Sequence, residues 1–310
     1  MPEHVTAERM LVVFLDGVGL GDDDPKVNPF AQADLPTVRN LLDGRRPVYH
    51  DTPFSTRRAS LVPLDAQLGV PGLPQSGTGQ TTILTGVNAP ALLGHHYGPY
   101  PNQALRELLS NGNLFRRLLA SGKPAAFANA YPDRFLNRLG RGTERLSANT
   151  RAALQAGLKL RGPDDLIAGR AVSALLTNEY WQQWGYDVPE LSTSEAGAQL
   201  AELAQDHALT YFEFWYTDVA GHRQDQELSL RVLSMLDEFV AGILDRLDLE
   251  RTLLLVISDH GNMEDWTSPK HTHNPALCLL VGAGHETLAT RLRSLQDITP
   301  VLTATLTGSG

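Results

Sequence analysis

The chain has 310 residues, of which 42% are hydrophobic and 20% are charged, and this globular composition excludes disorder, collagen and coiled coil. Its formal net charge of −9 disfavours binding to nucleic acid or to an anionic membrane, because a negative surface repels phosphate groups. The single cysteine, Cys278, excludes an internal disulfide framework and fits a reducing compartment.

The first residues are not typical of a secretory signal. Their apolar run, Met10–Leu15, is short, ends at Asp16, and is preceded by Glu3 and Glu8 rather than by cationic residues. The sequence contains no apolar stretch that approaches the ~20 residues needed to cross a bilayer. We therefore expect a soluble, cytoplasmic protein with neither membrane nor nucleic acid as a partner.

Five short apolar runs are typical of strands that are buried on both faces of a sheet. In chain order they are Met10–Asp16, Pro124–Ala130, Thr210–Asp218, Thr252–Asp259 and Ala276–Gly282. Apolar residues at three- and four-residue spacing predict helices in the intervening segments. These helices are Leu35–Leu42, Asn102–Leu109, Asn113–Ala120, Ser194–Ala204 and Asp225–Leu247, with Asn113 and Ser194 as N-caps. The alternation predicts a doubly wound α/β fold, a mainly parallel sheet with helices on both faces.

Between residues 131 and 193 this pattern loosens. The stretch is rich in arginine, glycine, proline and polar residues. We expect it to form a small inserted cap or lid on a single domain that spans residues 1–310. Its aromatic residues are expected to form the small core of this lid or, alternatively, to line a pocket; they are Tyr180, Trp181, Trp184 and Tyr186.

Three of the expected strands run into an aspartate: Asp16, Asp218 and Asp259. One such aspartate would be an ordinary turn or N-cap residue. In open α/β sheets, however, ligands bind beyond the carboxyl ends of the strands, so three acids there are candidates for one site. Histidines accompany two of them, since His222 follows Asp218 in D-V-A-G-H and His260 follows Asp259 in S-D-H-G-N.

A later segment, H-T-H-N-P, adds His271 and His273. Carboxylates and imidazoles at one sheet edge suit a divalent metal with mixed oxygen and nitrogen ligands, such as zinc or manganese. Three aspartates and at least three histidines exceed the needs of one tetrahedral site, which favours two metals in one crevice. The alternative is a set of polar loop caps.

The segment P-Q-S-G-T-G-Q-T-T at residues 74–82 places a small hydroxyl residue, Ser76, at an expected helix start. Backbone N–H groups at such a position can hold an anion, although the pattern alone is more often an ordinary turn. It is not a Walker A loop, since no Gly-Lys-Ser/Thr follows. Nor is it Gly-x-Ser-x-Gly, because Gln75 precedes Ser76.

Five short motifs, taken together and in this order, resemble the alkaline phosphatase superfamily. They are Asp16-Gly17, S-x-x-G-Q at 76–80, D-x-x-G-H at 218–222, S-D-H-G-N at 258–262 and H-T-x-N-P at 271–275. The branch they resemble contains cofactor-independent phosphoglycerate mutase and phosphopentomutase. The resemblance implies an alkaline phosphatase-like α/β core with two divalent metal ions, Mn²⁺ or Zn²⁺, as cofactors.

The resemblance also implies which residues hold the two metals. The first set is Asp16, Ser76, Asp259 and His260. The second set is Asp218, His222 and His271. His271 occupies the ligand position of the family, while an extended backbone would direct His273 to the opposite side, so His273 is the second choice.

Ser76 is the nucleophile that the resemblance implies, with Thr78 as the alternative. A serine hydroxyl is a poor nucleophile at neutral pH, and coordination to a dication would stabilise its alkoxide. Ser76 would attack the phosphorus of a small phosphorylated substrate to give a phosphoserine. Hydroxide, or an acceptor hydroxyl on the substrate, would then remove the phosphoryl group.

Two departures from the mutases bear on the reaction. The mutases carry large cap domains, whereas only residues 131–193 are available here, so water would reach the phosphoserine. Gln80 also stands where the mutases have histidine. We therefore predict a phosphohydrolase, either a phosphatase or a phosphodiesterase. The alternatives are a phosphomutase of small phosphorylated metabolites and a non-catalytic metal- or ligand-binding protein; no sulfatase motif, C/S-x-P-x-R, surrounds Ser76.

Contacts to the substrate do not follow from these motifs. Charge and loop position suggest His95, His96, Asn129, Arg134 and Lys270. Each of these residue types is more often an ordinary surface or turn residue. Cys278, in an apolar run, is expected to be a buried small hydrophobe.

Overall fold

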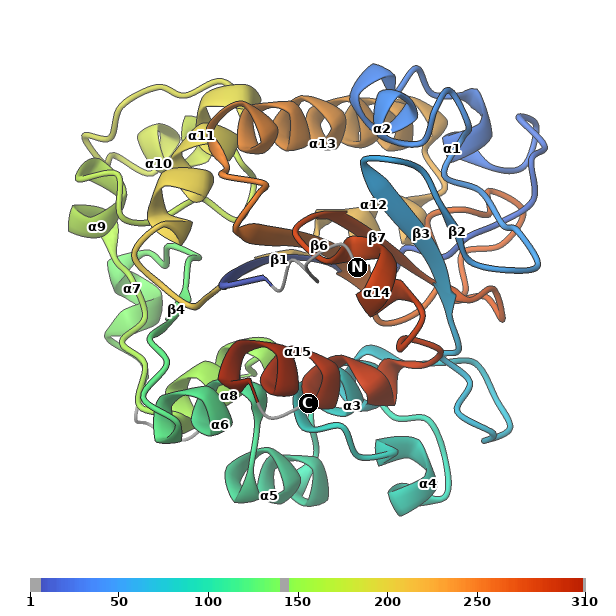
Figure 1. Ribbon diagram of the computed structural model, residues 1–310. Helices are drawn as coiled ribbons and strands as arrows, with labels where there is room; N and C mark the ends of the chain where they lie inside the picture. Colours follow the sequence, from blue (N-terminus) through green and yellow to red (C-terminus); the bar gives the residue numbers. More distant parts are fainter. Residues whose placement is uncertain (1–6, 140–144, 309–310) are drawn as a thin grey trace.

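The computed structural model describes residues 7–139 and 145–308, and within them seven strands form one sheet between two layers of helices (Figure 1). The order across the sheet is β2-β3-β7-β6-β1-β5-β4. The strands are β1 (Arg9–Leu15), β2 (Phe54–Ser55), β3 (Ala59–Leu64), β4 (Ala125–Phe127), β5 (Leu209–Phe214), β6 (Thr252–Ser258) and β7 (Ala276–Gly282).

The centre of the sheet is parallel and one side is antiparallel. β6, β1, β5 and β4 are parallel neighbours, whereas β7 runs antiparallel to β6 and β3, and β2 runs antiparallel to β3. This arrangement confirms the predicted α/β class. Sequence analysis missed β3 and β2 because Pro63 interrupts the apolar run of β3 and β2 has only two residues.

Helices cover both faces of the sheet (Figure 1). One face carries α1 (Pro29–Gln32), α2 (Pro36–Leu41), α11 (Thr193–Ala204) and α13 (Gln226–Arg246). The other carries α3 (Ser76–Thr85), α5 (Gln103–Asn111), α6 (Leu114–Ala120), α8 (Ala148–Gln155) and α15 (Ile298–Thr307). The shorter helices are α4 (Ala89–Leu93), α7 (Asp133–Leu136), α9 (Pro163–Ile167), α10 (Glu179–Gln183), α12 (Tyr216–Arg223), α14 (His285–Ala289) and a 3₁₀ turn (Leu295–Asp297).

Side chains of the central strand alternate between two hydrophobic cores. Leu11 and Val13 of β1 pack in the core beneath α13, whereas Val12 and Phe14 pack in the core beneath α15. This period of two explains why buried parallel strands have continuous apolar sequences. Cys278 of β7 is buried in the second core, as predicted.

The five predicted helices are present as α2, α5, α6, α11 and α13. Asn113 caps α6 by accepting a hydrogen bond from the backbone N–H of Arg116, as predicted. The prediction of Ser194 as a cap is wrong. Ser192 caps α11 instead, because its hydroxyl and the side chain of Glu195 exchange hydrogen bonds with each other's backbone N–H groups.

Two glycines let α11 and α13 approach closely. A Cβ atom at Gly197 would lie 2.1 Å from the carbonyl oxygen of Phe239, and one at Gly242 would lie 1.9 Å from that of Ser194. Any side chain at these positions would push the helices apart. The two glycines therefore allow the close packing of α11 against α13.

Residues 131–193 are attached beside β4 through isolated bridges, which pair Ala130 with Arg161 and Asn129 with Val172. Within this stretch α8 joins the layer of α3, α5 and α6, whereas α9 and α10 lie at the sheet edge (Figure 1). The second part has a small core of its own, which contains Trp181 and is packed against Tyr186. Residues 140–144 of the predicted lid lie outside the described residues, and movement of the segment as a lid stays a prediction.

No helix in the described ranges has both the length and the apolar character that crossing a bilayer requires.

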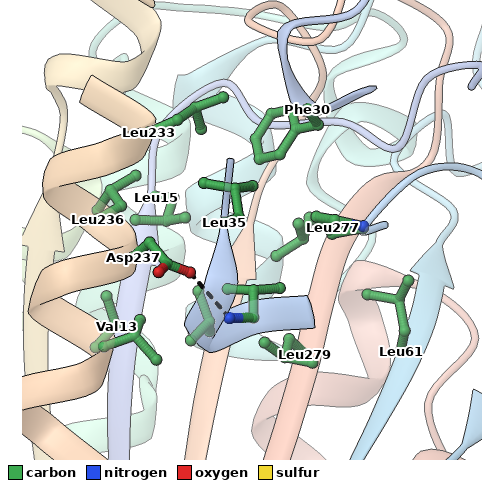
Figure 2. Close-up of a pocket in the computed structure, with 14 residues that line it drawn as sticks. Val13, Leu15, Phe30, Leu35, Leu61, Leu233, Leu236, Asp237, Leu277 and Leu279 are labelled. Atoms are coloured by element: carbon green, nitrogen blue, oxygen red, sulfur yellow. Dashed lines mark hydrogen bonds between the residues drawn. The ribbon is translucent and has the colours of Figure 1, made fainter. Parts of the chain in front are cut away.

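A buried carboxylate fixes α2 against α13. Asp237 of α13 is 4% exposed and accepts hydrogen bonds of 2.9 Å from the backbone N–H groups of Thr37 and Val38. These N–H groups belong to the first turn of α2, whose N-cap residue, Leu35, has an apolar side chain that cannot accept them. Figure 2 shows Asp237 beside a small cavity whose other lining side chains are mostly apolar.

We expect Asp237→Ala to lower the free energy of unfolding by about 1–2 kcal/mol, because two partly buried N–H groups in the first turn of α2 lose their acceptor. Asp245→Ala, on the exposed side of the same helix, should change it by less than about 0.5 kcal/mol. Urea denaturation of both variants measures the difference. Equal stability of the two variants would show that the buried carboxylate does not anchor α2.

Candidate metal centre

The site lies at the carboxyl ends of the parallel strands. Asp16 directly follows β1, and Asp259 directly follows β6, as expected. Asp218 does not end a strand: β5 stops at Phe214, and Asp218 lies in the first turn of α12. The predicted strand was too long because the apolar run continues through Trp215 after the ladder has ended.

Asp16, Asp259 and His260 form one group, the first triad, whose ligand atoms all lie within 4.8 Å of one another. His260 Nε2 is 3.4 Å from Asp16 Oδ1 and 3.7 Å from Asp259 Oδ2. Ser76, the first residue of α3, places its Oγ 3.0 Å from the same His260 Nε2. The four residues of the first predicted ligand set are thus brought together.

Asp218, His222 and His271 form the second triad, also with ligand atoms within 4.8 Å of one another. One turn of α12 separates Asp218 from His222, so His222 Nε2 lies 3.3 Å from Asp218 Oδ2. His271 Nε2 is 3.7 Å from Asp218 Oδ1. The rings of His260 and His271 stack with centroids 3.8 Å apart, so the two triads share one crevice.

Backbone carbonyls fix the orientation of both histidines in the second triad. His222 Nδ1 lies 2.7 Å from the carbonyl oxygen of Pro269, and His271 Nδ1 lies 2.7 Å from that of Pro74. Since a carbonyl oxygen only accepts, each Nδ1 carries the proton in these contacts. Each Nε2 therefore faces the crevice, where neutral imidazole can ligate a metal.

Two buried oxygens test whether the site fits divalent cations. Asp16 Oδ1 and Asp259 Oδ2 are buried, and neither has a hydrogen-bond partner in the described part of the chain. Buried carboxylate oxygens normally have partners. Burial raises the pKa of Asp16, and it raises the pKa of Asp259 well above the usual range. Buried carboxylate oxygens that accept no hydrogen bond, beside an imidazole nitrogen that becomes a ligand once it loses its proton, fit metal ions such as Zn²⁺ or Mn²⁺.

The protonation of the histidines is consistent with this fit. Burial alone would lower the pKa of His260, but the charges of Asp259 and Asp16 raise it to about 10. Without metal, His260 is therefore protonated, and its positive charge balances the negative charge of the neighbouring aspartates. Burial and the neighbouring His260 lower the pKa of His271 to about 4, which keeps its imidazole neutral at pH 7. Burial would raise the pKa of Asp218, but its hydrogen bond with His222 lowers it to about 2.

Comparison with known proteins agrees with this geometry. The sequence model of the Metalloenzyme superfamily matches residues 159–307, which include the whole second triad together with Asp259 and His260. The resemblance to this superfamily is confirmed. The 2,3-bisphosphoglycerate-independent phosphoglycerate mutase of Pyrococcus abyssi is 26% identical over 129 residues, which are 39% of this chain and 31% of that enzyme. The chain therefore spans less than a third of the length of this relative.

Solved structures are similar over nearly the whole chain. The PH0037 protein of Pyrococcus horikoshii has a TM-score of 0.59 at 16% identity and covers 99% of this chain and 98% of its own. The alkaline phosphatase of Thermus thermophilus has a TM-score of 0.56 at 14% identity, with coverage of 99% and 93%. At these identities the likeness shows the fold alone. It confirms an alkaline phosphatase-like fold for this chain.

Gly17, in the Asp16-Gly17 motif, is required by the crowding of the crevice. Its φ of +67° is a left-handed conformation, and a Cβ atom there would lie 2.6 Å from Asp218 Oδ1. Its backbone N–H also donates to Asp259 Oδ1 at 3.4 Å. A single glycine thus lets the loop after β1 pass between acids of the two triads.

Gln80 orients Asp16. Its Nε2 donates to Asp16 Oδ2 at 3.2 Å, and its Oε1 accepts from the backbone N–H of Ala148 at 3.1 Å. The glutamine that stands where the mutases have histidine therefore links α3, α8 and the first triad. Its partners lie far from it in the sequence, so the motif alone did not reveal this role.

Asn262 and Glu264 form hydrogen bonds that position the triads and the loops around them. Asn262 Nδ2 donates to Asp218 Oδ1 at 2.9 Å, and Glu264 accepts from the backbone N–H groups of Gly19 and Asn262. Asn262 belongs to the S-D-H-G-N motif, but sequence analysis gave it no role. Glu264 had no sequence signal, because the groups it binds include backbone N–H groups of a distant loop.

Thr78 and His273, the two second choices, are placed differently from Ser76 and His271. The hydroxyl of Thr78 donates to the carbonyl of Gln75 and accepts from the backbone N–H of Tyr97, so it serves the local backbone. His273 is exposed and lies outside both triads. The geometry therefore favours Ser76 and His271 for the roles that the resemblance implies.

A cavity of about 410 Å³ opens beside Ser76. Its lining residues are Asp16, Ser76, Gln80, Pro99, Tyr100, Tyr131, Phe135, Arg145, Leu146, Ser147, Thr150, Glu213, Trp215, Asp218 and Val219. These described residues include none of the five suggested substrate contacts and none of the four lid aromatics. Asn129 instead bonds the backbone of Glu213, and Arg134 lies over the ring of Trp184.

Glu213 of β5 is a buried acid in this cavity that sequence analysis missed. It is 4% exposed, and its carboxylate accepts hydrogen bonds from Ser147, Asn149 and Thr150. Burial raises its pKa to about 7, and the nearby charge of Asp16 adds to the rise. The sequence feature that could have indicated it is the single charged residue within the apolar run of β5, LTYFEF.

Removal of the Glu213 charge should change the pH dependence of stability in metal-free protein. With a pKa of about 7 when folded against 4.5 ordinarily, Glu213 binds its proton more tightly in the folded chain. Protonated Glu213 therefore stabilises the fold fully below pH 4.5. This stabilisation is lost as the pH rises to about 7, which lowers the free energy of unfolding by about 3 kcal/mol. Urea denaturation in EDTA at pH 5 and pH 8 should show this fall in wild type and lose it in Glu213→Gln. Equal pH dependence in both proteins would contradict the prediction.

Metal binding should depend on His271 and not on His273. We expect wild type to bind two Mn²⁺ or Zn²⁺ ions per chain by calorimetry. His271→Ala should lower the affinity for one of these ions by about 100-fold or more, because a ligand is lost. His273→Ala should bind both ions with wild-type affinity. Loss of an ion in His273→Ala, with both ions kept in His271→Ala, would reverse the assignment.

Proposed function

We propose that this chain is a two-metal phosphohydrolase that cleaves small phosphate esters through a phosphoserine on Ser76. The observation that carries the proposal is the position of Ser76, whose hydroxyl lies beside the first triad and lines the cavity. A purely metal-binding protein would have no need of a hydroxyl there. The net charge of −9 supports a small substrate rather than nucleic acid.

The roles of the residues follow from their placement. Asp16, Asp259 and His260 would hold one ion next to Ser76, and the second triad would hold the other. When bound, the two ions would supply positive charge to the serine oxygen and to the phosphoryl group. Gln80 keeps Asp16 in place, and Asn262 does the same for Asp218.

The start of α3 presents Ser76 to the substrate. Gly77 follows it, and a Cβ atom at Gly77 would lie 2.6 Å from the carbonyl oxygen of Tyr97. The absence of a side chain lets the 97–100 loop pack directly against the helix start. Ser76 is thereby held at the N-terminus of a ten-residue helix, whose dipole favours the negative charge that develops there.

Water access supports hydrolysis. Tyr100 and Trp215, which line the cavity, are each 41% exposed. Among the described residues that line it, none comes from α9 or α10, the outer part of the proposed lid. A phosphoserine at Ser76 would thus be open to attack by water. A phosphomutase is the second candidate, because the relative from Pyrococcus abyssi is named as a mutase.

Ser76→Ala should abolish the phosphoserine and lower phosphate release at least about 10³-fold, because the nucleophile is lost. Intact-protein mass and free phosphate are measured after incubation of the Mn²⁺- or Zn²⁺-loaded enzyme with phosphate monoesters and diesters. Thr78→Val, which removes the alternative hydroxyl, should keep the adduct and the activity.

Three results would change the proposal. An adduct that returns its phosphoryl group to an isomer of the substrate would establish a mutase. An adduct that persists in Ser76→Ala and disappears in Thr78→Val would move the nucleophile to Thr78. If the protein binds metal but forms no adduct and releases neither phosphate nor an isomer from any ester, the result would favour a non-catalytic metal-binding protein.

A further inference from the structure

Four aromatic rings line the cavity beside Ser76: Tyr100, Tyr131, Phe135 and Trp215. They come from the loop before α5, the segment between β4 and α7, α7 itself, and the turn between β5 and α12. Two of them form a fixed pair, because the rings of Tyr131 and Phe135 stack with centroids 4.6 Å apart. The hydroxyl of Tyr131 is also held 2.8 Å from that of Thr150.

The other two rings have free surface. Tyr100 and Trp215 are each 41% exposed, although both line a cavity that contains the proposed nucleophile. Trp215 contacts Tyr216 edge to face, which supports it from one side. Aromatic surface of this kind is stabilised when another planar ring covers it. The cavity volume of about 410 Å³ is within the range of pockets for small organic molecules.

The charges in the cavity disfavour an anionic leaving group. Arg145 is the one basic side chain among the described lining residues, and it is exposed. Glu213 lines the same cavity and is buried. A leaving group with a carboxylate, such as that of a phosphoglycerate, would find few cations and a buried acid. A neutral leaving group with an aromatic ring would need no cation and would cover the exposed rings.

We propose that this cavity is the leaving-group pocket and that it selects phosphate esters whose leaving group carries a planar aromatic ring. The inference rests on the proposed function, because the ring must lie beside an ester cleaved at Ser76. In the first step the Ser76 Oγ–P bond forms, the ester P–O bond breaks, and the released alcohol takes the proton lost by Ser76. Water then cleaves the phosphoserine, which restores the Ser76 hydroxyl and releases phosphate.

The test compares esters that differ in the leaving group. The metal-loaded enzyme is assayed with benzyl phosphate and adenosine 5′-monophosphate against glycerol 3-phosphate and 3-phosphoglycerate, all of which release an alkyl alcohol. We expect kcat/KM to be at least about 10-fold higher for the aromatic esters. The two aromatic substrates distinguish an aryl group from a nucleobase as the preferred ring.

Trp215→Ala should lower kcat/KM for the aromatic esters about 10-fold and leave glycerol 3-phosphate unchanged within about twofold. Trp184→Ala is the matched control, since Trp184 is a similarly exposed tryptophan, at 45%, that does not line the cavity. Phe135→Leu provides a second variant from another wall. Equal losses on all four esters in Trp215→Ala would overturn the inference.

A binding experiment separates this inference from the proposed function. Adenosine, which has no phosphate to transfer, is titrated into wild type, Trp215→Ala and Trp184→Ala and followed by isothermal titration calorimetry. Saturable binding that is lost only in Trp215→Ala supports the pocket even if no ester is cleaved. Ser76-dependent phosphate release from all esters without preference, or no adenosine binding, would overturn the pocket and leave the hydrolase proposal standing on its own evidence.

Discussion

The site depends on negative charge gathered at one edge of the sheet. The parallel order of β6, β1 and β5 brings Asp259, Asp16 and the start of α12 side by side, because parallel strands end at the same edge. Buried carboxylates this close repel one another and lose hydration. The neighbouring groups are arranged around this repulsion: histidines face the acids, amides bind their outer oxygens, and two oxygens remain unpaired.

Rigid backbone supports make this arrangement specific. Both histidines of the second triad are oriented by backbone carbonyls, and Gln80 is held by α8, so the ligand atoms do not depend on flexible surface chains. The hydrogen bonds of Glu213 tie α8 to β5 at the wall of the cavity. The proposed substrate pocket and the candidate metal centre thus share structural elements, since Asp16, Ser76 and Asp218 also line the cavity.

Much of this organisation could be predicted from the sequence, because local patterns carry it. Apolar runs that end in Asp16 and Asp259 marked two strands and the edge they share, and the helix at Asp225–Leu247 followed from its spacing. Asp218 was misplaced within its element because apolar residues continue past the end of β5. β3 was missed because its pairing with β7 is a tertiary contact and its sequence contains Pro63.

The remaining features arise only on folding. Gln80, Glu213 and Glu264 act through partners many residues away, so no local pattern predicted their roles. The aromatic cavity wall likewise combines four distant segments, whereas the conspicuous aromatic run at 180–186 lies elsewhere. The short motifs predicted the metal ligands and the class of chemistry, but the residues proposed to select a substrate come together only in the folded chain.

The most direct test of the account is the location of bound metal in crystals of the Mn²⁺- or Zn²⁺-loaded protein by anomalous scattering. The account predicts two peaks in one crevice. One should lie among Asp16, Asp259 and His260 next to the Ser76 hydroxyl, and the other among Asp218, His222 and His271. A single peak, or peaks away from Ser76, would contradict a two-metal centre built around this serine.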